Sequence, residues 1–256
     1  MGPVLGQSVG SYRDRAPPAA LRRHFARTWI HRLPARHSQP VSIVPDGCID
    51  LQWIDGGLRV AGPDREAKVE SIPAGATVIG LRFQPASAMA WLHAPASEIV
   101  DARPPLEAFW GGEARRLADW AGEARTAEGV ANRLEAALAR KAVNIDAPDR
   151  ASHSIFRLIS ANRQPNTRIV NHLNDLLGLS ERTLRRRCHE AFGYGPKTLD
   201  RILRFQRFLR LARIGNPTGA AELAAEAGYS DQSHMIRETR RLAGLTPTAI
   251  VNQVCG

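Results

Sequence analysis

Residues 219–244, "GAAELAAEAGYSDQSHMIRETRRLAG", predict two short helices joined by a tight turn. Gly228 can adopt the positive φ that ends the first helix. Ser230 or Asp231 can then cap the second helix by accepting a backbone N–H hydrogen bond. Ala224, four residues before the glycine, is small enough to let the two helices approach closely. This pattern is typical of a helix-turn-helix unit.

A second copy of this unit occurs earlier in the chain. Asn174 occupies the place of Ala224 there, which predicts either looser packing or a buried hydrogen bond. Between the two units, residues 196–213 carry a wide apolar stripe, which predicts one long helix that packs against both. The repeated positions are Gly178, Leu179 and Ser180 with Gly228, Tyr229 and Ser230, offset by 50 residues, and Leu184, Gly193 and Pro196 with Met235, Gly244 and Pro247, offset by 51.

The second helix of each unit is predicted to face DNA. On a helical wheel Leu184, Cys188 and Ala191 share one side, and the arginines of the same helix lie opposite or on the flanks. A solvated charged face is the alternative, but two copies behind equivalent turns favour a helix that enters the major groove. The predicted base contacts are Arg182, Arg185, Arg186, Gln232, Ser233 and Arg237. The predicted phosphate or capping contacts are Ser180, Thr183, Lys197 and Ser230, whereas His234 is expected to pack beside Tyr229.

The distribution of charge supports a polyanionic partner. The net charge is +10, and residues 151–256 hold 16 Lys and Arg against 8 Asp and Glu, whereas residues 1–150 hold 19 against 17. Nucleic acid is therefore the first candidate partner. No apolar run approaches the roughly 20 residues that span a bilayer, and the first twenty residues lack the apolar stretch of a secretory signal. We expect a cytoplasmic protein without a membrane partner.

The rest of the chain predicts a separate domain. Short β-branched or aromatic-rich segments, separated by Gly, Pro and Asp turns, indicate an all-β sandwich or barrel. Apolar residues then recur at helical spacing over 105–141, with glycines that divide the segment into two or three helices. The predicted strands lie within 22–33, where Phe25, Arg27, Trp29 and His31 share one parity, and at 41–44, 49–54, 58–61 and 77–83.

The predicted fold is therefore a two-domain α+β protein. Residues 1–143 form an N-terminal cupin-like β-barrel with a helical appendix from about residue 105, which either covers the barrel or forms a dimer contact. Residues 144–150 are a linker. Residues 151–256 form an all-α domain of two helix-turn-helix units joined by a long helix. Its predicted helices are 151–161, 166–176, 180–191, 196–213, 218–227, 231–242 and 247–253.

The sequence shows no motif of an enzyme or a metal site. Cys48, Cys188 and Cys255 lie far apart without a C-x-x-C pair, and His31 and His37 do not form a His-x-His ligand pair. A nucleophile elbow, a P-loop and a Rossmann fingerprint are also missing. We therefore expect no catalytic residues, no metal and no cofactor. The tryptophans are expected mainly in the core, although a pocket that uses Trp53 is an alternative, and no residue is singled out as effector-binding.

The helix-turn-helix segments resemble a known family. "AAEAGYSDQSHMIRETRRLAGLTPTAI" (224–250) and "GLSERTLRRRCHEAFGYGPK" (178–197) are similar to the DNA-binding domain of AraC/XylS-family transcription regulators. "VPDGCIDLQW" (44–53) and "GLRFQPASAMAWL" (80–92) more weakly resemble the cupin-like sensing domain that often precedes it. The chain departs from the family at Cys188 and Thr239, which replace large inner-face aromatics. Such a replacement costs packing energy on the order of a few kcal/mol unless neighbours fill the space.

The resemblance implies a regulator of transcription. It implies a barrel that binds a small-molecule effector or a partner, a helical region that forms a homodimer, and double-stranded DNA and RNA polymerase as partners. Together with the residues, it predicts sequence-specific reading of two successive major grooves, roughly 34 Å apart. The alternative is a small-molecule-binding protein or enzyme with a basic RNA-binding module. A protein-interaction adaptor, the third class, would bind no nucleic acid.

Overall fold

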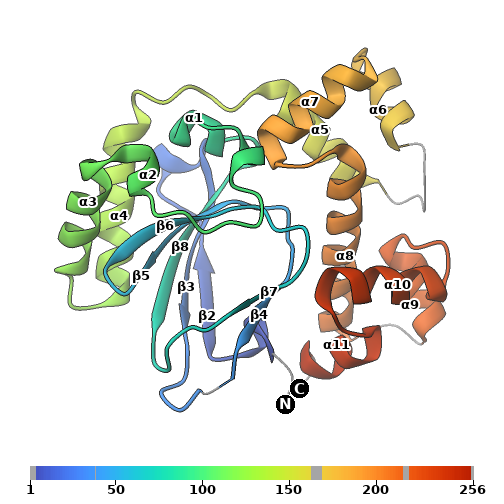
Figure 1. Ribbon diagram of the computed structural model, residues 1–256, viewed down its shortest axis with the longest axis horizontal. Coiled ribbons are helices and arrows are strands. Elements are labelled where there is room, and N and C mark those ends of the chain that lie inside the picture. Colours follow the sequence, from blue (N-terminus) through green and yellow to red (C-terminus); the bar gives the residue numbers. More distant parts are fainter. Residues whose placement is uncertain (1–3, 38, 163–168, 216–218, 255–256) are drawn as a thin grey trace.

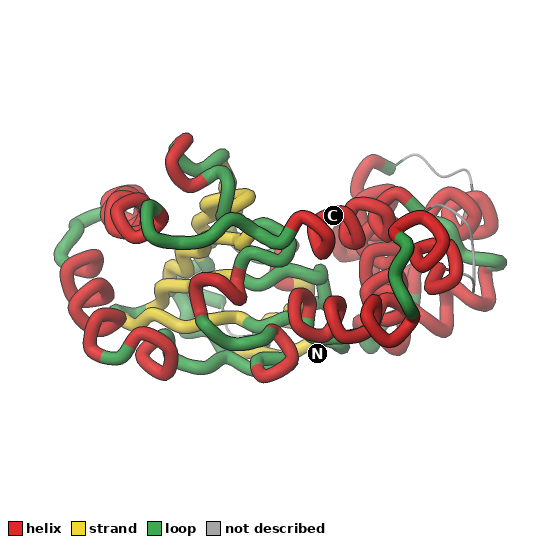
Figure 2. Tube along the Cα trace, turned by 90° about the horizontal axis from the view of Figure 1, so that it is seen from above, coloured by secondary structure: helices red, strands yellow, loops and turns green. Residues whose placement is uncertain are grey.

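The computed structural model describes residues 4–37, 39–162, 169–215 and 219–254. These residues form two domains side by side, a sheet-containing N-terminal domain and an all-helical C-terminal domain (Figures 1 and 2). The predicted two-domain α+β fold is confirmed. No helix in these ranges combines the length and the apolar character that crossing a membrane requires.

The N-terminal strands form two sheets. In the described residues, the larger sheet is antiparallel with the order β2-β3-β8-β5-β6, and the smaller has the order β1-β4-β7. The strands that were predicted to form a cupin-like β-barrel thus form two sheets and not one closed cylinder. The strands are β1 (Val4–Leu5), β2 (Ser11–Arg15), β3 (Phe25–Arg32), β4 (Val41–Ile43), β5 (Asp50–Ile54), β6 (Gly57–Ala61), β7 (Lys68–Glu70) and β8 (Thr77–Phe83).

The larger sheet has two chemically different faces. Strand residues alternate between faces, and the register pairs Trp29 with Gly80, Gly80 with Gln52, and Gln52 with Arg59 across four strands. This face is therefore polar and aromatic. The other face is apolar and belongs to a core cluster that includes Leu51, Leu58, Val60, Ile79, Leu81 and Phe83.

A β-bulge corrects the parity predicted for β3. The register with β8 shifts between Phe25 and Arg27, so that Phe25 pairs with Phe83. A bulge inserts one extra residue and exchanges the faces beyond it. Phe25 therefore lies in the apolar core, with its ring 4.6 Å from that of Phe83, whereas Trp29 remains on the polar face. The predicted shared parity of Phe25 with Arg27, Trp29 and His31 is wrong for this reason.

Helices cover the apolar face of the larger sheet (Figure 1). Thr126 caps the longest of these helices, α4, by accepting a hydrogen bond from the Gly129 N–H at 3.0 Å. Leu134 and Leu138 of α4 are fully buried, so the apolar stripe of this helix covers the sheet. Dimer formation stays a prediction. The helices are α1 (Ala88–Leu92), α2 (Glu107–Trp110), α3 (Gly112–Gly122) and α4 (Ala127–Ala142).

The C-terminal domain consists of helices at the predicted places. Between its two helix-turn-helix units, the long helix α8 contacts helices of both (Figure 1). The predicted helix starts at 166–168 and at 218 lie outside the described residues, as does Cys255. The helices are α5 (Arg150–Ala161), α6 (Ile169–Leu177), α7 (Glu181–Phe192), α8 (Pro196–Ile214), α9 (Ala220–Ala227), α10 (Gln232–Ala243) and α11 (Pro247–Val254).

Gly80 is expected to be indispensable for the packing of the sheet. A Cβ at residue 80 would overlap Cε2, Cζ2 and Nε1 of the Trp29 indole. Gly80→Ala should therefore lower the free energy of unfolding by about 1–3 kcal/mol through overpacking, as measured by urea denaturation. Gly57→Ala in the same sheet is the control, because only the Ile54 carbonyl oxygen, at 3.6 Å, would contact its Cβ. Equal losses for the two variants would contradict this role of Gly80.

Candidate functional site

The first helix-turn-helix unit has the turn and the cap that its sequence predicts. Gly178 has φ +62°, and Ser180 Oγ accepts a hydrogen bond from the Thr183 N–H at 3.2 Å. Leu184 and Cys188 are fully buried on the inner face of α7. The opposite face of α7 therefore points away from the core of the unit.

The arginines of α7 divide into two groups. Arg182 and Arg185, near the N-terminus of the helix, are exposed and form no hydrogen bond or ion pair with any described residue. Arg186 pairs with Glu190 at 3.0 Å, one turn later on the same helix. Arg187 pairs with Asp149, the residue that caps α5, at 2.8 Å. The N-terminal half of α7 thus carries the unengaged cations.

The C-terminal half of α7 lies beside the N-terminal domain. Arg186 and Arg187 line a recess together with Ala86 and Met89, which belong to the segment around α1. This position leaves Arg182 and Arg185, near the N-terminal end of α7, accessible. The N-terminal end is also where the base-reading side chains of a recognition helix are concentrated.

In the second unit, Asp231 is the residue that caps the recognition helix. Its Oδ1 accepts a hydrogen bond from the His234 N–H at 2.7 Å, while the Ser230 hydroxyl donates to Asp231 Oδ2 at 3.0 Å. The structure thereby decides between the two predicted caps. Gln232, Ser233 and Arg237 are exposed on α10, at places equivalent to the exposed face of α7.

The two residues that replace large aromatics on the inner faces of α7 and α10 are completely enclosed by their neighbours. Cys188 and Thr239 are both fully buried, and Thr239 Oγ1 donates to the Ile236 carbonyl at 3.1 Å. Burial raises the pKa of the Cys188 thiol to about 12, so it remains protonated at neutral pH. His234 packs edge-on against Tyr229 with the ring centroids 5.3 Å apart, as predicted.

The turn of the first unit, at Asn174, is less completely hydrogen-bonded than the turn of the second unit. Its Oδ1 is buried without a hydrogen-bond partner in the described ranges. The turn bond from the Leu179 N–H to the Asn174 carbonyl measures 3.3 Å, against 2.8 Å from Tyr229 to Ala224. Of the two predicted alternatives, the buried side-chain hydrogen bond is therefore not the one observed.

Buried arginines on α8 hold the C-terminal domain together. Arg207 is 5 % exposed and donates to the carbonyls of Ala227 at 2.9 Å, Asn162 at 2.8 Å and Ser160 at 3.1 Å. These carbonyls are at or next to the C-terminal ends of α9 and α5, where a cation is favourable. Arg207 therefore ties α5 and, from the second unit, α9 to the long helix α8.

One loop of the N-terminal domain packs directly on α8. The Pro45 carbonyl, between β4 and β5, accepts a hydrogen bond from Gln206 Nε2 at 2.6 Å. A Cβ at the neighbouring Gly47 would lie 3.4 Å from Leu199 Cδ1. The loop therefore contacts the helix that joins the two helix-turn-helix units.

A second loop contacts the C-terminal ends of both recognition helices. The Ala67 N–H, between β6 and β7, donates to the Leu242 carbonyl near the end of α10 at 2.8 Å. Gly193, directly after α7, packs so closely on Pro63 and Val100 that a Cβ there would lie 2.9 and 2.6 Å from their side chains. Both units are thus docked against the same domain.

A cavity of about 120 Å³ lies on the polar face of the larger sheet. Its lining includes Trp29 and Arg82 from the larger sheet and Ile43 from the smaller. Leu209 and Arg213 of α8 also line it, so the C-terminal domain contributes to its wall. Trp53, the residue that the sequence offered for a pocket, is not in this lining; it lies in the cluster that faces the helices.

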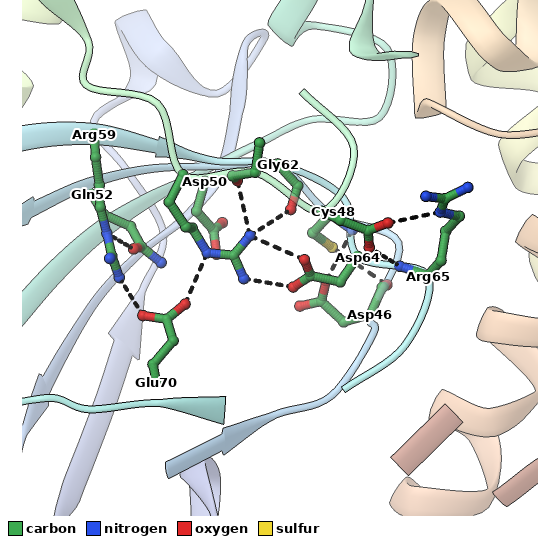
Figure 3. Close-up of polar contacts among 12 residues, drawn as sticks. Asp46, Cys48, Asp50, Gln52, Arg59, Gly62, Asp64, Arg65 and Glu70 are labelled. Atoms are coloured by element: carbon green, nitrogen blue, oxygen red, sulfur yellow. Dashed lines mark hydrogen bonds and ion pairs between the residues drawn. The ribbon is translucent and has the colours of Figure 1, made fainter. Parts of the chain in front are cut away.

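Arginine–carboxylate pairs line one side of the cavity (Figure 3). Arg103 bridges Asp64 at 2.6 Å and Glu70 at 2.9 Å, and Arg59 pairs with Glu70 at 2.7 Å. Arg82 bridges Asp46 at 2.6 Å and Asp50 at 3.0 Å. The four carboxylates belong to the segments 46–50 and 64–70, which include or adjoin the two loops that dock on the helical domain.

Burial and pairing set the protonation of these groups. Burial raises the pKa of Glu70, but the charges and hydrogen bonds of Arg59 and Arg103 outweigh it and hold this pKa below its usual range. Burial also raises the pKa of Asp64, although Arg103 opposes the shift. The Cys48 thiol has its pKa raised well above its usual range by burial, so it is not a thiolate.

Comparisons with known proteins agree with this organisation. Residues 173–253 match a helix-turn-helix domain and residues 13–105 a domain of unknown function. No curated protein matches the chain. A ToxT variant from Vibrio cholerae strain SCE256 in its apo form shares the fold at 11 % identity, with a TM-score of 0.52 over 94 % of this chain and 100 % of that chain.

Two further solved structures are similar to parts or most of the chain. ToxT from Vibrio cholerae O395 matches with a TM-score of 0.51 at 10 % identity, over 95 % of this chain and 99 % of that one. A probable AraC family transcriptional regulator from Rhodopseudomonas palustris CGA009 shares 25 % identity over 42 % of this chain and 100 % of that chain, with a TM-score of 0.37.

The resemblance to the AraC/XylS family is confirmed. The helix-turn-helix match extends from within α6 to within α11, so it contains both units and the connecting helix. The likeness to ToxT extends over both domains and shows the fold. Every residue predicted to contact DNA, from Ser180 to Arg237, thus lies within the segment that matches a helix-turn-helix domain.

The sequence does not distinguish the structural arginines of the C-terminal domain from arginines that contact DNA. Arg204 is 7 % exposed and pairs with Asp200, one turn earlier on α8. The spacing of the pair was a usable signal, because oppositely charged residues four apart share a helix face. Arg207 carried no comparable signal, since its partners are backbone carbonyls distant in sequence.

We expect Arg103 to be essential for the stability of the N-terminal domain. Arg103→Met should lower the free energy of unfolding by about 3–5 kcal/mol, because it leaves the carboxylates of Asp64 and Glu70 without their shared cation. Urea denaturation of the full chain measures the loss. Arg115→Met is the control, because its pair with Glu107 is on the surface and should contribute little. Similar losses for the two variants would refute the structural role of the Arg103 pairs.

Proposed function

We propose that this AraC-type protein is a sequence-specific transcription regulator that reads two successive major grooves under the control of a small molecule bound in its N-terminal domain. The observation that supports groove reading is the pair of capped helices, α7 and α10, held on one helix with their polar faces exposed. A capped helix N-terminus also directs free N–H groups toward phosphate. RNA polymerase and a second copy of the chain stay predicted partners.

The proposed DNA contacts divide by chemistry. Arginine forms paired hydrogen bonds with guanine, and glutamine does so with adenine, so these side chains can specify bases. Hydroxyl and ammonium groups near the helix N-termini set the register on the phosphates. Arg186 would have to exchange Glu190 for a base. The proposed base contacts are Arg182, Arg185, Arg186, Gln232, Ser233 and Arg237, and the proposed phosphate contacts are Ser180, Thr183, Lys197 and Ser230.

Control by a small molecule is supported by the position of the cavity. Its carboxylates are on the segments whose loops contact α8 and the ends of α7 and α10, and Leu209 of α8 is part of its wall. A molecule that binds there with different affinity in two domain arrangements would shift the population between them. One ToxT structure is bound to (E)-4-(8-methylnaphthalen-1-yl)but-3-enoic acid, so a protein of this fold binds a small molecule.

Selection of bound duplexes from a random pool, followed by substitution of one recognition residue, tests the DNA function. Arg182→Ala should weaken binding to the selected duplex by about 1–3 kcal/mol and relax the preference at one base position. Fluorescence anisotropy at fixed salt measures the affinities. An equal loss on unrelated duplexes would show that Arg182 contacts only phosphate. Tighter binding of structured RNA than of any duplex would favour the RNA-binding alternative.

Lys197 tests the proposed phosphate contacts separately. Lys197 is exposed at the start of α8. Lys197→Ala should weaken the binding of all duplexes to the same extent and reduce the slope of log K against log salt by about one, because one phosphate contact releases about one counterion. Lys68→Ala, on β7 in the N-terminal domain, is the matched control. An unchanged slope in Lys197→Ala would exclude the contact.

A further inference from the structure

The cavity on the polar face of the larger sheet has a lining that selects among ligands. We propose that it binds an uncharged, planar aromatic molecule of one or two rings that carries a hydrogen-bond acceptor. The inference names the chemical class of the effector and therefore rests on the proposed function. It is carried by the aromatic floor, a buried donor without a partner, and the pairing of the charges around it.

The floor of the cavity is flat and aromatic. Gly80 has no side chain, and the Trp29 indole occupies the space above it, lying across β8. Tyr12, on the neighbouring edge strand, extends this surface with its ring 5.9 Å from that of Trp29 and inclined by 27°. A planar ring is the ligand shape that covers such a surface most fully by offset stacking.

The floor also contains a donor that requires an acceptor. Trp29 is 8 % exposed, and its Nε1–H is buried without a hydrogen-bond partner in the described part of the chain. An unsatisfied buried donor is unfavourable, and a ligand acceptor would remove that penalty once a small shift of the neighbouring groups lets it reach the Nε1–H. His31 is already engaged, because its Nε2 lies 2.6 Å from the Val9 carbonyl oxygen.

The charges of the cavity wall neutralise one another. All four carboxylates of the lining, those of Asp46, Asp50, Asp64 and Glu70, have arginine partners at 2.6–3.0 Å. Arg213, the remaining charged residue of the lining, also has an interaction within the protein. A charged ligand would have to break a half-buried pair and leave one partner exposed to the apolar side of the cavity. An uncharged ligand avoids this cost.

The opposite wall and the volume limit the size of the ligand. Aliphatic side chains line the cavity in addition to the indole, among them Ile43 of the smaller sheet and Leu209 of α8. The cavity volume of about 120 Å³ is close to the about 150 Å³ of an engineered cavity that holds benzene. One aromatic ring therefore fits inside the cavity, and a second fused ring would have to extend toward its open side.

Four bicyclic probes of similar shape test the class of ligand on the full-length protein. Quinoline is uncharged at pH 8 and has a ring-nitrogen acceptor, naphthalene lacks the acceptor, 1-methylquinolinium is a cation and 2-naphthoate is an anion. We expect isothermal titration calorimetry to rank quinoline first, with naphthalene weaker by about tenfold for the missing hydrogen bond. Tighter binding of either ion, or no binding of quinoline, would overturn the proposal.

Variants locate the binding on the floor of the cavity. Trp29→Phe keeps an aromatic ring but removes the donor, so it should weaken quinoline about tenfold and leave naphthalene nearly unchanged. Trp53→Phe is the matched control, because the Trp53 Nε1–H is also buried without a partner, but on the helix-covered face of the sheet. Equal effects of the two variants would overturn the proposal. Tyr12→Ala, at a half-exposed position of the edge strand β2, should weaken the binding of both probes.

The same samples separate this proposal from the proposed function. Anisotropy with a selected duplex is recorded with and without saturating quinoline. Specific DNA binding without any quinoline binding would overturn the ligand class and leave the DNA function intact. Quinoline binding that depends on Trp29, in a protein that binds no duplex, would support the ligand class and refute the regulator. Quinoline that binds and changes the duplex affinity supports both.

Discussion

The pairing of Arg82 and Arg103 with carboxylates is the constraint on which the rest of the molecule depends. Guanidinium groups lie beside a largely apolar cavity at acceptable cost only when carboxylates are within hydrogen-bond distance. Those carboxylates come from segments 46–50 and 64–70. Their pairing fixes the course of the two adjoining loops. Because these loops contact α8 and the ends of α7 and α10, the charge pairs also fix the position of the DNA-reading units.

The helix α8 connects the cavity with the two helix-turn-helix units, because it lines the cavity and contacts helices of both units. Leu209 lines the cavity, while Arg207 of the same helix donates to carbonyls at the ends of α5 and α9. A packed helix moves as a rigid element, so under the proposed function a change at the cavity would reach both units together. Part of the positive charge of the C-terminal domain is structural, as Arg207 shows, and the proposed DNA contacts are a different part of it.

The elements of the C-terminal domain were predictable because their signals are local. Glycines at the turns, capping side chains and an apolar period of 3.6 residues repeat within each unit. The strands of the N-terminal domain were predicted less completely. Strand β2, "SYRDR", is exposed along its whole length as an edge of the sheet, and β1 and β7 have two and three residues. Neither a short strand nor a polar edge strand has the alternation that sequence analysis recognises.

The sequence by itself determined the two helix-turn-helix units and the residues exposed on α7 and α10, because each depends on contacts within about fifty residues. Only the tertiary structure decided that Phe25 and Trp29 lie on opposite faces, since a single bulge exchanges them. It alone brought Arg82 and Arg103 to one cavity and placed Leu209 in its wall. These contacts join distant segments through burial and charge pairing, for which a linear sequence carries no periodic signal.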